Sequence, residues 1–342
     1  MNITTIGIDL AKSVFQVHGT DERGKAVLGK VLRRAQMMKF FTQLPPCLIG
    51  MEACGSAHFW ARKLTALGHT VKLMAPQFVK PYVKTNKNDA RDAEAICEAV
   101  GRPTMRFVAI KSPEQQALLA VHRARQGLVQ ARTAQGNQIR GLLAEFGCVI
   151  PKGRRHLEHH IPEILEDAEN GLSGMSRELF ARLLEHLRSL DEQVQALERQ
   201  IKAWQREDAA SRRLEQIPGI GPLTASALVA SIGDARNFKN GRQLSAWLGL
   251  VPRQCSSGGK STLLGISKRG DVYLRTLLIH GARSVLQRAK PAEHWGAALA
   301  ERSNKNLAAV ALANKNARIV WALLAHGRNF QADYRAVRSQ AA

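Results

Sequence analysis

The chain has 342 residues, of which 45% are hydrophobic and 5% aromatic, and its 50 Lys and Arg against 28 Asp and Glu give a formal net charge of +22. This length and apolar content suffice for two or three domains with buried cores, which excludes a disordered chain. The charge predicts a polyanionic partner, and nucleic acid is favoured over an inert basic surface because each neutralised phosphate releases a counterion.

Membrane and disulfide-rich classes are disfavoured. We find no run of about 18 apolar residues that would span a membrane and no secretory layout at the N-terminus. A membrane-surface binder would need aromatic residues on a basic amphipathic helix, and aromatic residues are few. The five cysteines contain no CxxC pair, so we expect neither a disulfide scaffold nor a zinc ribbon, and a cytoplasmic location.

Residues 1–111 alternate between strand and helix patterns. Apolar or alternating runs, punctuated by turn residues, predict strands at 3–9, 13–19, 25–32, 47–51, 70–74 and 106–110, and helices at 36–44, 57–67 and 89–100. Three meandering strands followed by alternating helices and strands is the order of the ribonuclease-H-like fold, a mixed sheet with helices on both faces. We therefore predict a ribonuclease-H-like domain over residues 1–111.

Residues 112–205 predict long helices. A basic helical stretch covers 114–146, and a break follows at 147–153. Apolar residues then step alternately by four and three, at Leu183, Leu187, Leu190, Val194, Leu197, Ile201 and Trp204. This heptad pattern has two interpretations that stay open: a hairpin that packs on the preceding helix, or a coiled coil that pairs subunits.

Residues 206–342 form a third predicted domain, mainly helical. It carries 21 Lys and Arg against 8 Asp and Glu, which is more than half of the excess positive charge of the chain. This concentration predicts the main nucleic-acid surface here. We expect loops at 219–221, 249–264 and 268–271.

Four carboxylates suggest chemistry in the N-terminal domain. Asp9 and Glu52 each lie where a predicted buried strand ends, and parallel neighbours would bring both to one edge of the sheet. Asp89 and Asp92 begin a predicted helix, and their spacing places them on one face. Each acid also has a purely structural interpretation, as a helix cap or as a partner of an arginine.

Converging carboxylates predict a site for divalent cations. They cannot all ionise in a dry pocket without cations, and their hard oxygen ligands favour Mg²⁺, with Mn²⁺ as a substitute. Two such ions would clamp the attacking and leaving oxygens of a phosphodiester. Actin-like ATPases and sugar kinases share the strand–Asp turn, but the second phosphate loop of the DxGxT kind is not found in this sequence.

Two glycine-containing segments of the C-terminal domain are further candidates. The turn at 217–225 resembles a helix-hairpin-helix, in which backbone N–H groups at Gly219 and Gly221 would grip a phosphate, or it is a tight turn between core helices. The loop at 249–260 presents Ser257 between Arg253 and Lys260. A serine in such a setting could attack phosphorus, although most Ser/Gly loops are only loops.

Some polar clusters suggest no chemistry of their own. His156, His159 and His160 have the density of a metal site but no nearby cysteine, and we interpret them as a solvated patch. Cys255 beside the serine has no assigned role.

These segments, in their order and spacing, resemble the DEDD transposases of bacterial insertion sequences, a family that includes Piv-type DNA invertases and bridge-RNA-guided recombinases. The resemblance covers nearly the whole chain and rests on GID with Ala11-Lys12, MEA with Gly55, KNDARDA at 87–93, PGIG at 218–221, and GLVPR at 249–253, followed by Ser257-Gly258, Lys268-Arg269-Gly270 and Leu274-Arg275.

The resemblance implies a Holliday-resolvase-like (RuvC-like) domain, a coiled coil and a C-terminal transposase domain. It assigns the tetrad of metal ligands to Asp9, Glu52, Asp89 and Asp92, and the nucleophile to Ser257, with Ser256 as the less favoured neighbour. It also implies donor and target DNA and a structured noncoding RNA as partners. We further expect nucleic-acid contacts at Gly219, Gly221, Arg253, Lys260, Lys268, Arg269 and Arg275.

The sequence therefore predicts a bacterial, nucleoid-associated recombinase that mobilises an insertion sequence through a phosphoserine link. Because the tetrad and Ser257 fall in separate predicted domains, we expect a homo-oligomer, a dimer or tetramer, in which one subunit's acids could meet another's serine. Two alternatives stay open: a junction-resolving nuclease that uses water as nucleophile, and a non-enzymatic nucleic-acid-binding protein.

Overall fold

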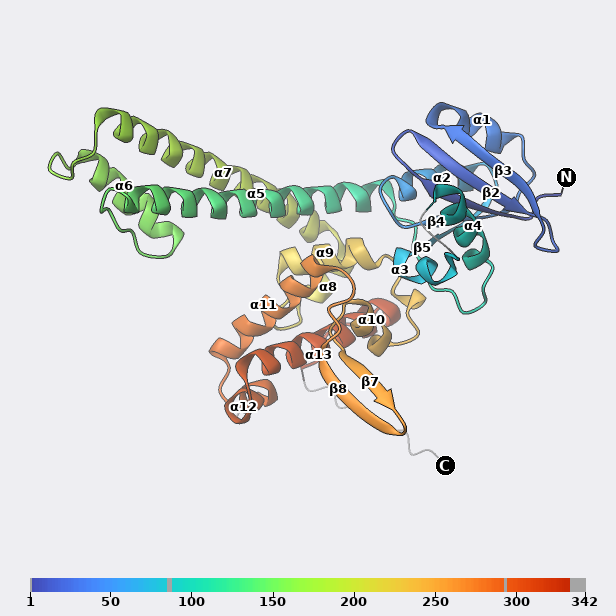
Figure 1. Ribbon diagram of the computed structural model, residues 1–342. Coiled ribbons are helices and arrows are strands. Elements are labelled where there is room, and N and C mark those ends of the chain that lie inside the picture. The colour runs from blue at the N-terminus through green and yellow to red at the C-terminus, as the bar shows by residue number, and fades with distance from the viewer. Residues whose placement is uncertain (1, 85–87, 292–293, 333–342) are drawn as a thin grey trace. The chain divides into compact units, whose positions relative to one another are not determined.

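The computed structural model describes residues 2–84, 88–291 and 294–332. The chain divides into two compact units, Met1–Pro113 and Glu114–Ala342 (Figure 1). The first boundary lies within two residues of the one predicted at 111/112. The further division at residue 206 stays a prediction.

A six-stranded mixed sheet forms the first unit, with the strand order β3-β2-β1-β4-β5-β6. Strands β1, β4 and β5 are parallel, whereas β2, β3 and β6 join antiparallel. The strands are β1 (Thr5–Leu10), β2 (Val14–Thr20), β3 (Ala26–Arg33), β4 (Leu48–Glu52), β5 (Thr70–Met74) and β6 (Phe107–Val108). All six predicted strands are confirmed, and the mixed sheet is consistent with a ribonuclease-H-like domain.

Helices pack on both faces of this sheet because the central strands are buried on both sides. Ile6 and Ile8 are fully buried and face the core that includes helices α1 and α2, while Gly7 between them faces α4. The helices of this unit are α1 (Met37–Thr42), α2 (Ala57–Ala66), α3 (Pro76–Val79) and α4 (Asp89–Val100), with short 3₁₀ turns at Arg34–Gln36 and Lys80–Tyr82.

The second unit begins with three helices, α5 (Pro113–Ala144), α6 (Arg154–Glu166) and α7 (Gly174–Glu207). Four heptad residues of α7, Leu187, Leu190, Val194 and Ile201, are at most 5% exposed within the single chain. Leu187 shares a core with Ile139 and Leu143 of α5. The structure thus favours the interpretation as a packed helical hairpin, and a coiled coil between subunits is not confirmed.

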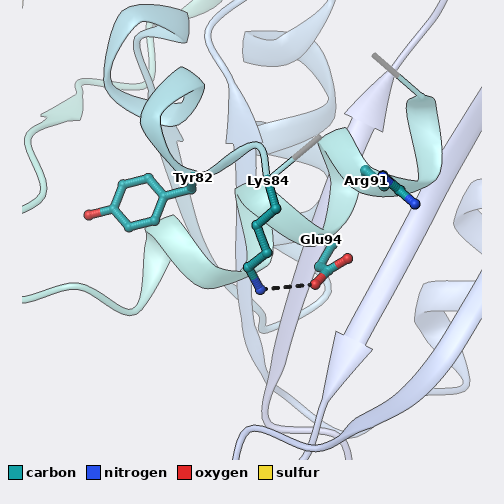
Figure 2. Close-up of a pocket in the computed structure, with 4 residues that line it drawn as sticks. All are labelled: Tyr82, Lys84, Arg91 and Glu94. Atoms are coloured by element: carbon teal, nitrogen blue, oxygen red, sulfur yellow. Dashed lines mark hydrogen bonds and ion pairs between the residues drawn. The ribbon is translucent and has the colours of Figure 1, made fainter. Parts of the chain in front are cut away.

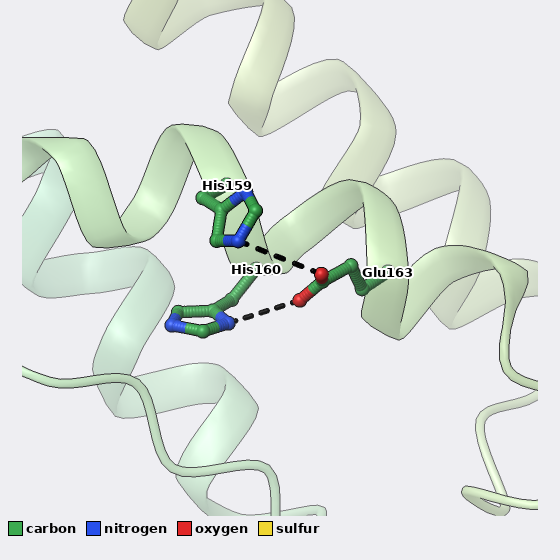
Figure 3. A group of neighbouring side chains, drawn as sticks. All are labelled: His159, His160 and Glu163. Atoms are coloured by element: carbon green, nitrogen blue, oxygen red, sulfur yellow. Dashed lines mark hydrogen bonds and ion pairs between the residues drawn. The ribbon is translucent and has the colours of Figure 1, made fainter.

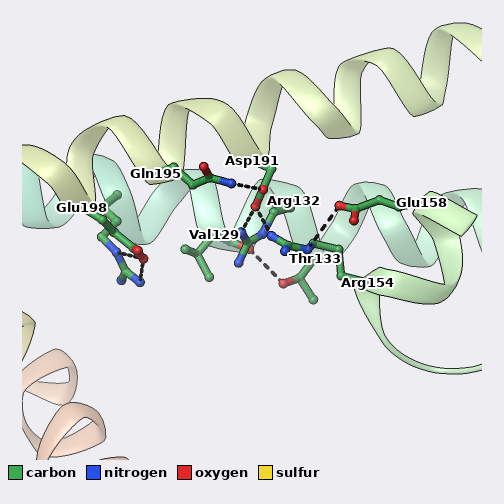
Figure 4. A network of polar contacts seen from close by, with 9 residues as sticks. Val129, Arg132, Thr133, Arg154, Glu158, Asp191, Gln195 and Glu198 are labelled. Carbon is green, nitrogen blue, oxygen red and sulfur yellow. Dashed lines mark hydrogen bonds and ion pairs between the residues drawn. The ribbon is translucent and has the colours of Figure 1, made fainter.

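Ion pairs join helices α5, α6 and α7 to one another (Figure 4). Asp191 of α7 accepts hydrogen bonds from the guanidinium groups of Arg132 of α5 and Arg154 of α6, and its second oxygen accepts one from Gln195 at 2.6 Å. Glu198 accepts from Nε of Arg125 at 2.9 Å. Because these carboxylates are paired within the chain, they fix the register of the three helices.

The rest of the second unit is a helical core with one β-hairpin. Its helices are α8 (Ala209–Glu215), α9 (Pro222–Ile232), α10 (Gly241–Trp247), α11 (Val272–Arg288), α12 (Trp295–Arg302) and α13 (Lys305–His326), with a 3₁₀ turn at Ala235–Asn237. Contrary to our expectation from the sequence, α13 is long and apolar enough to cross a membrane by length and composition. Its buried residues, among them Leu312 and Val320, lie in the helical core.

A buried histidine ties α5 to this core. His122 is 1% exposed, and its ring nitrogens lie 3.0 Å from the hydroxyl of Tyr273 and 3.1 Å from that of Ser226. The Ser226 hydroxyl donates its hydrogen to the carbonyl of Pro222 at 2.7 Å, so it accepts from Nε2–H of His122. Nδ1 then accepts from Tyr273, and the imidazole is neutral. Burial, and then the charge of Arg125, lower the pKa of His122 to about 4.

The predicted loop at 249–264 is wrong. The structure has two antiparallel strands there, β7 (Pro252–Ser257) and β8 (Lys260–Ile266), joined by Gly258 and Gly259, both with positive φ. Every residue of β7 and all but the last of β8 are exposed. With no buried face, the strands show no apolar alternation, and only the two-residue glycine turn could have signalled the hairpin.

Candidate functional site

Strand β1 and helix α4 bring three of the four predicted acids together. Asp9 lies near the end of β1, and Asp89 and Asp92 lie in the first turn of α4, which begins where the side chain of Asn88 accepts from the N–H of Ala90 at 3.0 Å. One carboxylate oxygen from each of the three acids lies within 4.8 Å of the others. The expected convergence of these three side chains is present in the structure.

Glu52 lies beside this group rather than within it. It is the last residue of β4, and the parallel register that pairs Ile8 with Met51 places it level with Asp9. Desolvation of the Cys54 thiol raises its pKa, and the negative charges of Glu52 and then Asp9 raise it further. Glu52 stays a proposed ligand.

Two glycines allow α4 to approach the sheet. A Cβ atom at Gly7 of β1 would lie 2.2 Å from the carbonyl oxygen of Ala93, and one at Gly50 of β4 would lie 2.8 Å from Cβ of Val100. Backbone therefore meets backbone where α4 crosses β1. This close approach sets how near the first turn of α4 comes to the end of β1, and hence the spacing of the acids.

The three carboxylates fit a hard divalent cation. Two oxygens bound to one Mg²⁺ at about 2.1 Å lie about 3 to 4 Å apart, so a separation of up to 4.8 Å needs a small side-chain adjustment or a second ion. The ligands are all oxygens, which Mg²⁺ and Mn²⁺ prefer. Asp9 and Asp92 are half-buried and Asp89 is exposed, so a phosphate can reach the group.

A pocket of about 260 Å³ is lined by Arg91 and Glu94 of α4 and by Tyr82 and Lys84 of the preceding segment (Figure 2). Lys84 pairs with Glu94 at 3.3 Å and with Glu98 at 3.4 Å. The sequence analysis did not identify this pocket. The alternation of basic and acidic residues across 84–94 was its only signal, and it does not distinguish a pocket from a solvated helix face.

Ser257 is the last residue of β7, directly before the glycine turn, and it is exposed. The neighbouring Ser256 hydroxyl accepts a hydrogen bond from Nε2 of Gln254 at 2.8 Å. Within the described residues, the Ser257 hydroxyl makes no hydrogen bond. Lys260 pairs with Ser257 across the tip of the hairpin, and Arg253 is exposed nearer its base.

The other expected nucleic-acid residues divide into two groups. Lys268 and Arg269 are exposed at the base of the hairpin, and Gly221 caps α9 with open space around it. Gly219 packs against α11, where a Cβ atom would lie 2.8 Å from the carbonyl oxygen of Gly281, so the turn also serves helix packing.

The expectation for Arg275 is corrected. Its side chain is not at the surface: the residue is 7% exposed, and its Nη1 donates to the carbonyl of Leu248 at 3.2 Å and to that of Arg269 at 3.5 Å. The guanidinium is directed at protein carbonyls, so the structure does not support the expected surface contact. Its type and position in the sequence gave no sign of its burial.

The histidine cluster lies on α6 (Figure 3). Glu163 pairs with Nδ1 of His160 at 3.0 Å and with Nε2 of His159 at 3.6 Å, and His156 stacks on His160 at 5.9 Å. These donor atoms are close enough to share an ion. Because His159 and Glu163 are exposed, the cluster agrees equally with the solvated patch that we expected.

Known proteins resemble the chain over both units. A family model for DEDD transposases of the IS110 type matches residues 6–147, and one described as "Transposase IS116/IS110/IS902 family" matches residues 211–295. A "Probable family 20 transposase" of Pseudomonas aeruginosa is 55% identical over 95% of this chain and 97% of its own length. The chain belongs to the IS110/IS116/IS902 family of transposases.

Other similar proteins support this assignment. The transposase for IS1328 of Yersinia enterocolitica is 45% identical, over 96% of this chain and 99% of its own. The transposase for IS1111A of Coxiella burnetii is 45% identical, over 96% and 92%. The protein is therefore an insertion-sequence transposase, an enzyme that acts on DNA, and DEDD membership agrees with the use of a divalent metal.

Proposed function

We propose that this transposase is a metal-dependent serine recombinase, in which Asp9, Glu52, Asp89 and Asp92 hold Mg²⁺ and Ser257 is the nucleophile. The observation that carries the proposal is the gathering of three carboxylates at the end of β1 and the start of α4. When bound, the cation neutralises charge that builds on the phosphate during attack. Mn²⁺ would serve in its place.

The reaction is an exchange of one ester bond for another. Oγ of Ser257 attacks phosphorus and forms a P–Oγ bond, while one P–O bond to a deoxyribose breaks and that oxygen leaves with the electron pair. The serine proton passes to a carboxylate or to water, and the leaving oxygen is protonated in turn. The exposure of Ser257 and its position opposite Lys260 support this role.

The partners we propose are donor DNA, target DNA and a noncoding guide RNA, held by a homo-oligomer on the bacterial nucleoid. The net charge of +22 supports the binding of two kinds of nucleic acid together. We propose phosphate contacts at Arg253, Lys260, Lys268 and Arg269, and backbone contacts at the turn that contains Gly219 and Gly221.

Covalent capture tests the proposal. The protein is incubated with DNA carrying the ends of its element, the candidate RNA and Mg²⁺, and DNA attached to protein is detected after denaturation. We expect an adduct that Ser257→Ala abolishes and the matched control Ser256→Ala retains. Cleavage that survives Ser257→Ala would favour the nuclease, and intact strands in both Mg²⁺ and Mn²⁺ would favour a binding protein.

The sharing of a site between subunits has its own test. Asp9→Asn and Ser257→Ala each lose the adduct alone, and we expect a mixture of the two proteins to recover it when acids and serine come from different subunits. A mixture that stays inactive, although both variants enter the same oligomer, would show that each subunit uses its own residues.

A further inference from the structure

The β7–β8 hairpin is an exposed element on a tightly built base. Its strands are open to solvent, and among the described residues they are held mainly by their pairing with each other. At the base, the N–H of Ser267 donates to the carbonyl of Val251 at 2.8 Å, and that of Lys268 donates to the carbonyl of Gly249 at 3.2 Å. The orientation of the hairpin is therefore decided where the chain enters and leaves it.

The entry to the hairpin is the end of α10. Gly249 has φ +74, its N–H donates to Ala246 at 3.0 Å, and the N–H of Leu250 donates to Ser245 at 3.0 Å. These two bonds form a Schellman motif, which ends the helix with a fixed change of direction. From α13, the side chain of Asn314 donates to the carbonyl of Leu250 at 3.1 Å.

Where the chain leaves the hairpin, at residues 269–270, it contacts the end of α10 so closely that no side chain fits between them. A Cβ atom at Gly270 would lie 1.9 Å from the carbonyl oxygen of Trp247, and one at Gly249 would lie 2.0 Å from that of Arg269. Lys268 adopts a left-handed conformation with φ +54. A strained conformation of this kind persists only when other interactions stabilise it.

Arg275 holds the entry and the exit together. Its Nη1 donates to Leu248, the C-cap of α10, and to Arg269 on the way out of the hairpin. It is buried, and within the described residues it forms no ion pair, so carbonyl dipoles at the negative end of α10 compensate its charge. Removing the guanidinium would leave these carbonyls unpaired. The close contact between the hairpin exit and the end of α10 would then lose the side chain that bonds to both.

We propose that Arg275 is a positioning residue that locks the base of the hairpin and so aims Ser257. That Arg275 aims Ser257 rests on the proposed role of Ser257. That Arg275 fixes the base of the hairpin does not. Arg275 is buried and acts through the two ends of the hairpin. When the base of a hairpin is fixed, its tip can occupy only a narrow range of positions. Attack on phosphorus requires such restricted positioning.

The first readout is motion of the hairpin and does not depend on activity. A fluorophore is attached to the exposed Cys255 in a chain with Cys54→Ser and Cys148→Ser, leaving the buried Cys47 and Cys97. We expect Arg275→Gln to lower the anisotropy of the label, and Arg275→Lys to restore part of it by bonding one carbonyl. Arg283→Gln, an exposed arginine of the same helix, is the control.

The second readout separates delivery of the serine from DNA binding. In single turnover, the adduct should form roughly 100-fold more slowly in Arg275→Gln, with DNA affinity close to that of Arg283→Gln. Gly270→Ala, which disturbs the same base without touching the cation, should act in the same direction.

Three results would overturn the inference. These are unchanged anisotropy in both Arg275→Gln and Gly270→Ala, an adduct rate that falls only in proportion to DNA affinity, and a mobile hairpin that still reacts at the normal rate. If Ser257→Ala itself still forms the adduct, the proposed function fails instead, and the anisotropy alone decides whether Arg275 fixes the hairpin.

Discussion

Replacing Gly7 by Ala should separate the acids by pushing α4 away from β1. The new Cβ would lie 2.2 Å from the carbonyl oxygen of Ala93, and contacts below 3.0 Å essentially do not occur, so helix and strand must part by at least 0.8 Å. Overpacking of this kind costs about 1–3 kcal/mol of unfolding free energy. A shift approaching 1 Å between Asp9 and the first turn of α4 would slow adduct formation by roughly 100-fold.

The matched control is Gly29→Ala, on strand β3 of the same sheet, where a Cβ atom has nothing within 4 Å. Hydrogen exchange of peptides from β1 and β4 measures the local stability, and single-turnover adduct formation measures the site. We expect lower protection and slower chemistry in Gly7→Ala only. Equal behaviour of the two variants would refute the argument that backbone contact at Gly7 sets the spacing of the acids.

Three further substitutions test other parts of the molecule. Neutral His122 contributes stability above the unfolded pKa of about 6.5, and this stability is lost as pH falls through about 4. In urea titrations, the free energy of unfolding should therefore fall by up to about 3 kcal/mol less in His122→Gln than in the parent between those pH values. Asp191→Asn should cost about 3 kcal/mol, because two arginines lose their buried partner, whereas Glu178→Gln, in an exposed pair, should cost under about 1 kcal/mol in the same assay. Asp92→Asn should weaken Mn²⁺ binding on the order of tenfold, measured by water relaxation, and Glu94→Gln should not.

Each of these has a result that contradicts it. An unchanged pH profile in His122→Gln would mean that the buried imidazole is not the group that acid titrates. Equal costs for Asp191→Asn and Glu178→Gln would mean that the pairing of α5, α6 and α7 at one carboxylate contributes no more than a surface contact. Retained Mn²⁺ affinity in Asp92→Asn would remove it from the ligands.

The N-terminal sheet was predictable because its buried strands are runs of apolar residues in the sequence. Strands such as β1 and β4 are short apolar runs with turn residues on either side, and their order is enough to place Asp9 and Glu52 at one edge. The spacing of Asp89 and Asp92 put both on one face of α4. What the sequence does not show is how close helix and sheet come, because that depends on backbone contacts at Gly7.

In the helical unit, pattern alone was less informative. A heptad of apolar residues predicts a buried seam but not its partner, and Leu187 packs on a helix of its own chain. The β7–β8 strands are exposed on both faces, so they lack the alternation by which strands are recognised. Arg275 looked like any other cation of a basic segment, because the carbonyls that hold it come from residues 6 and 27 positions away.

The hairpin has a consequence for how such an element can diversify. Its outward residues contact little else, whereas its anchoring glycines and arginine tolerate almost no change in shape. Mutation can therefore rewrite the ribbon's surface without unfolding the helices beneath. Substitutions at the outward positions of the hairpin would then change only the contacts that the hairpin itself makes, while its anchored base stays intact.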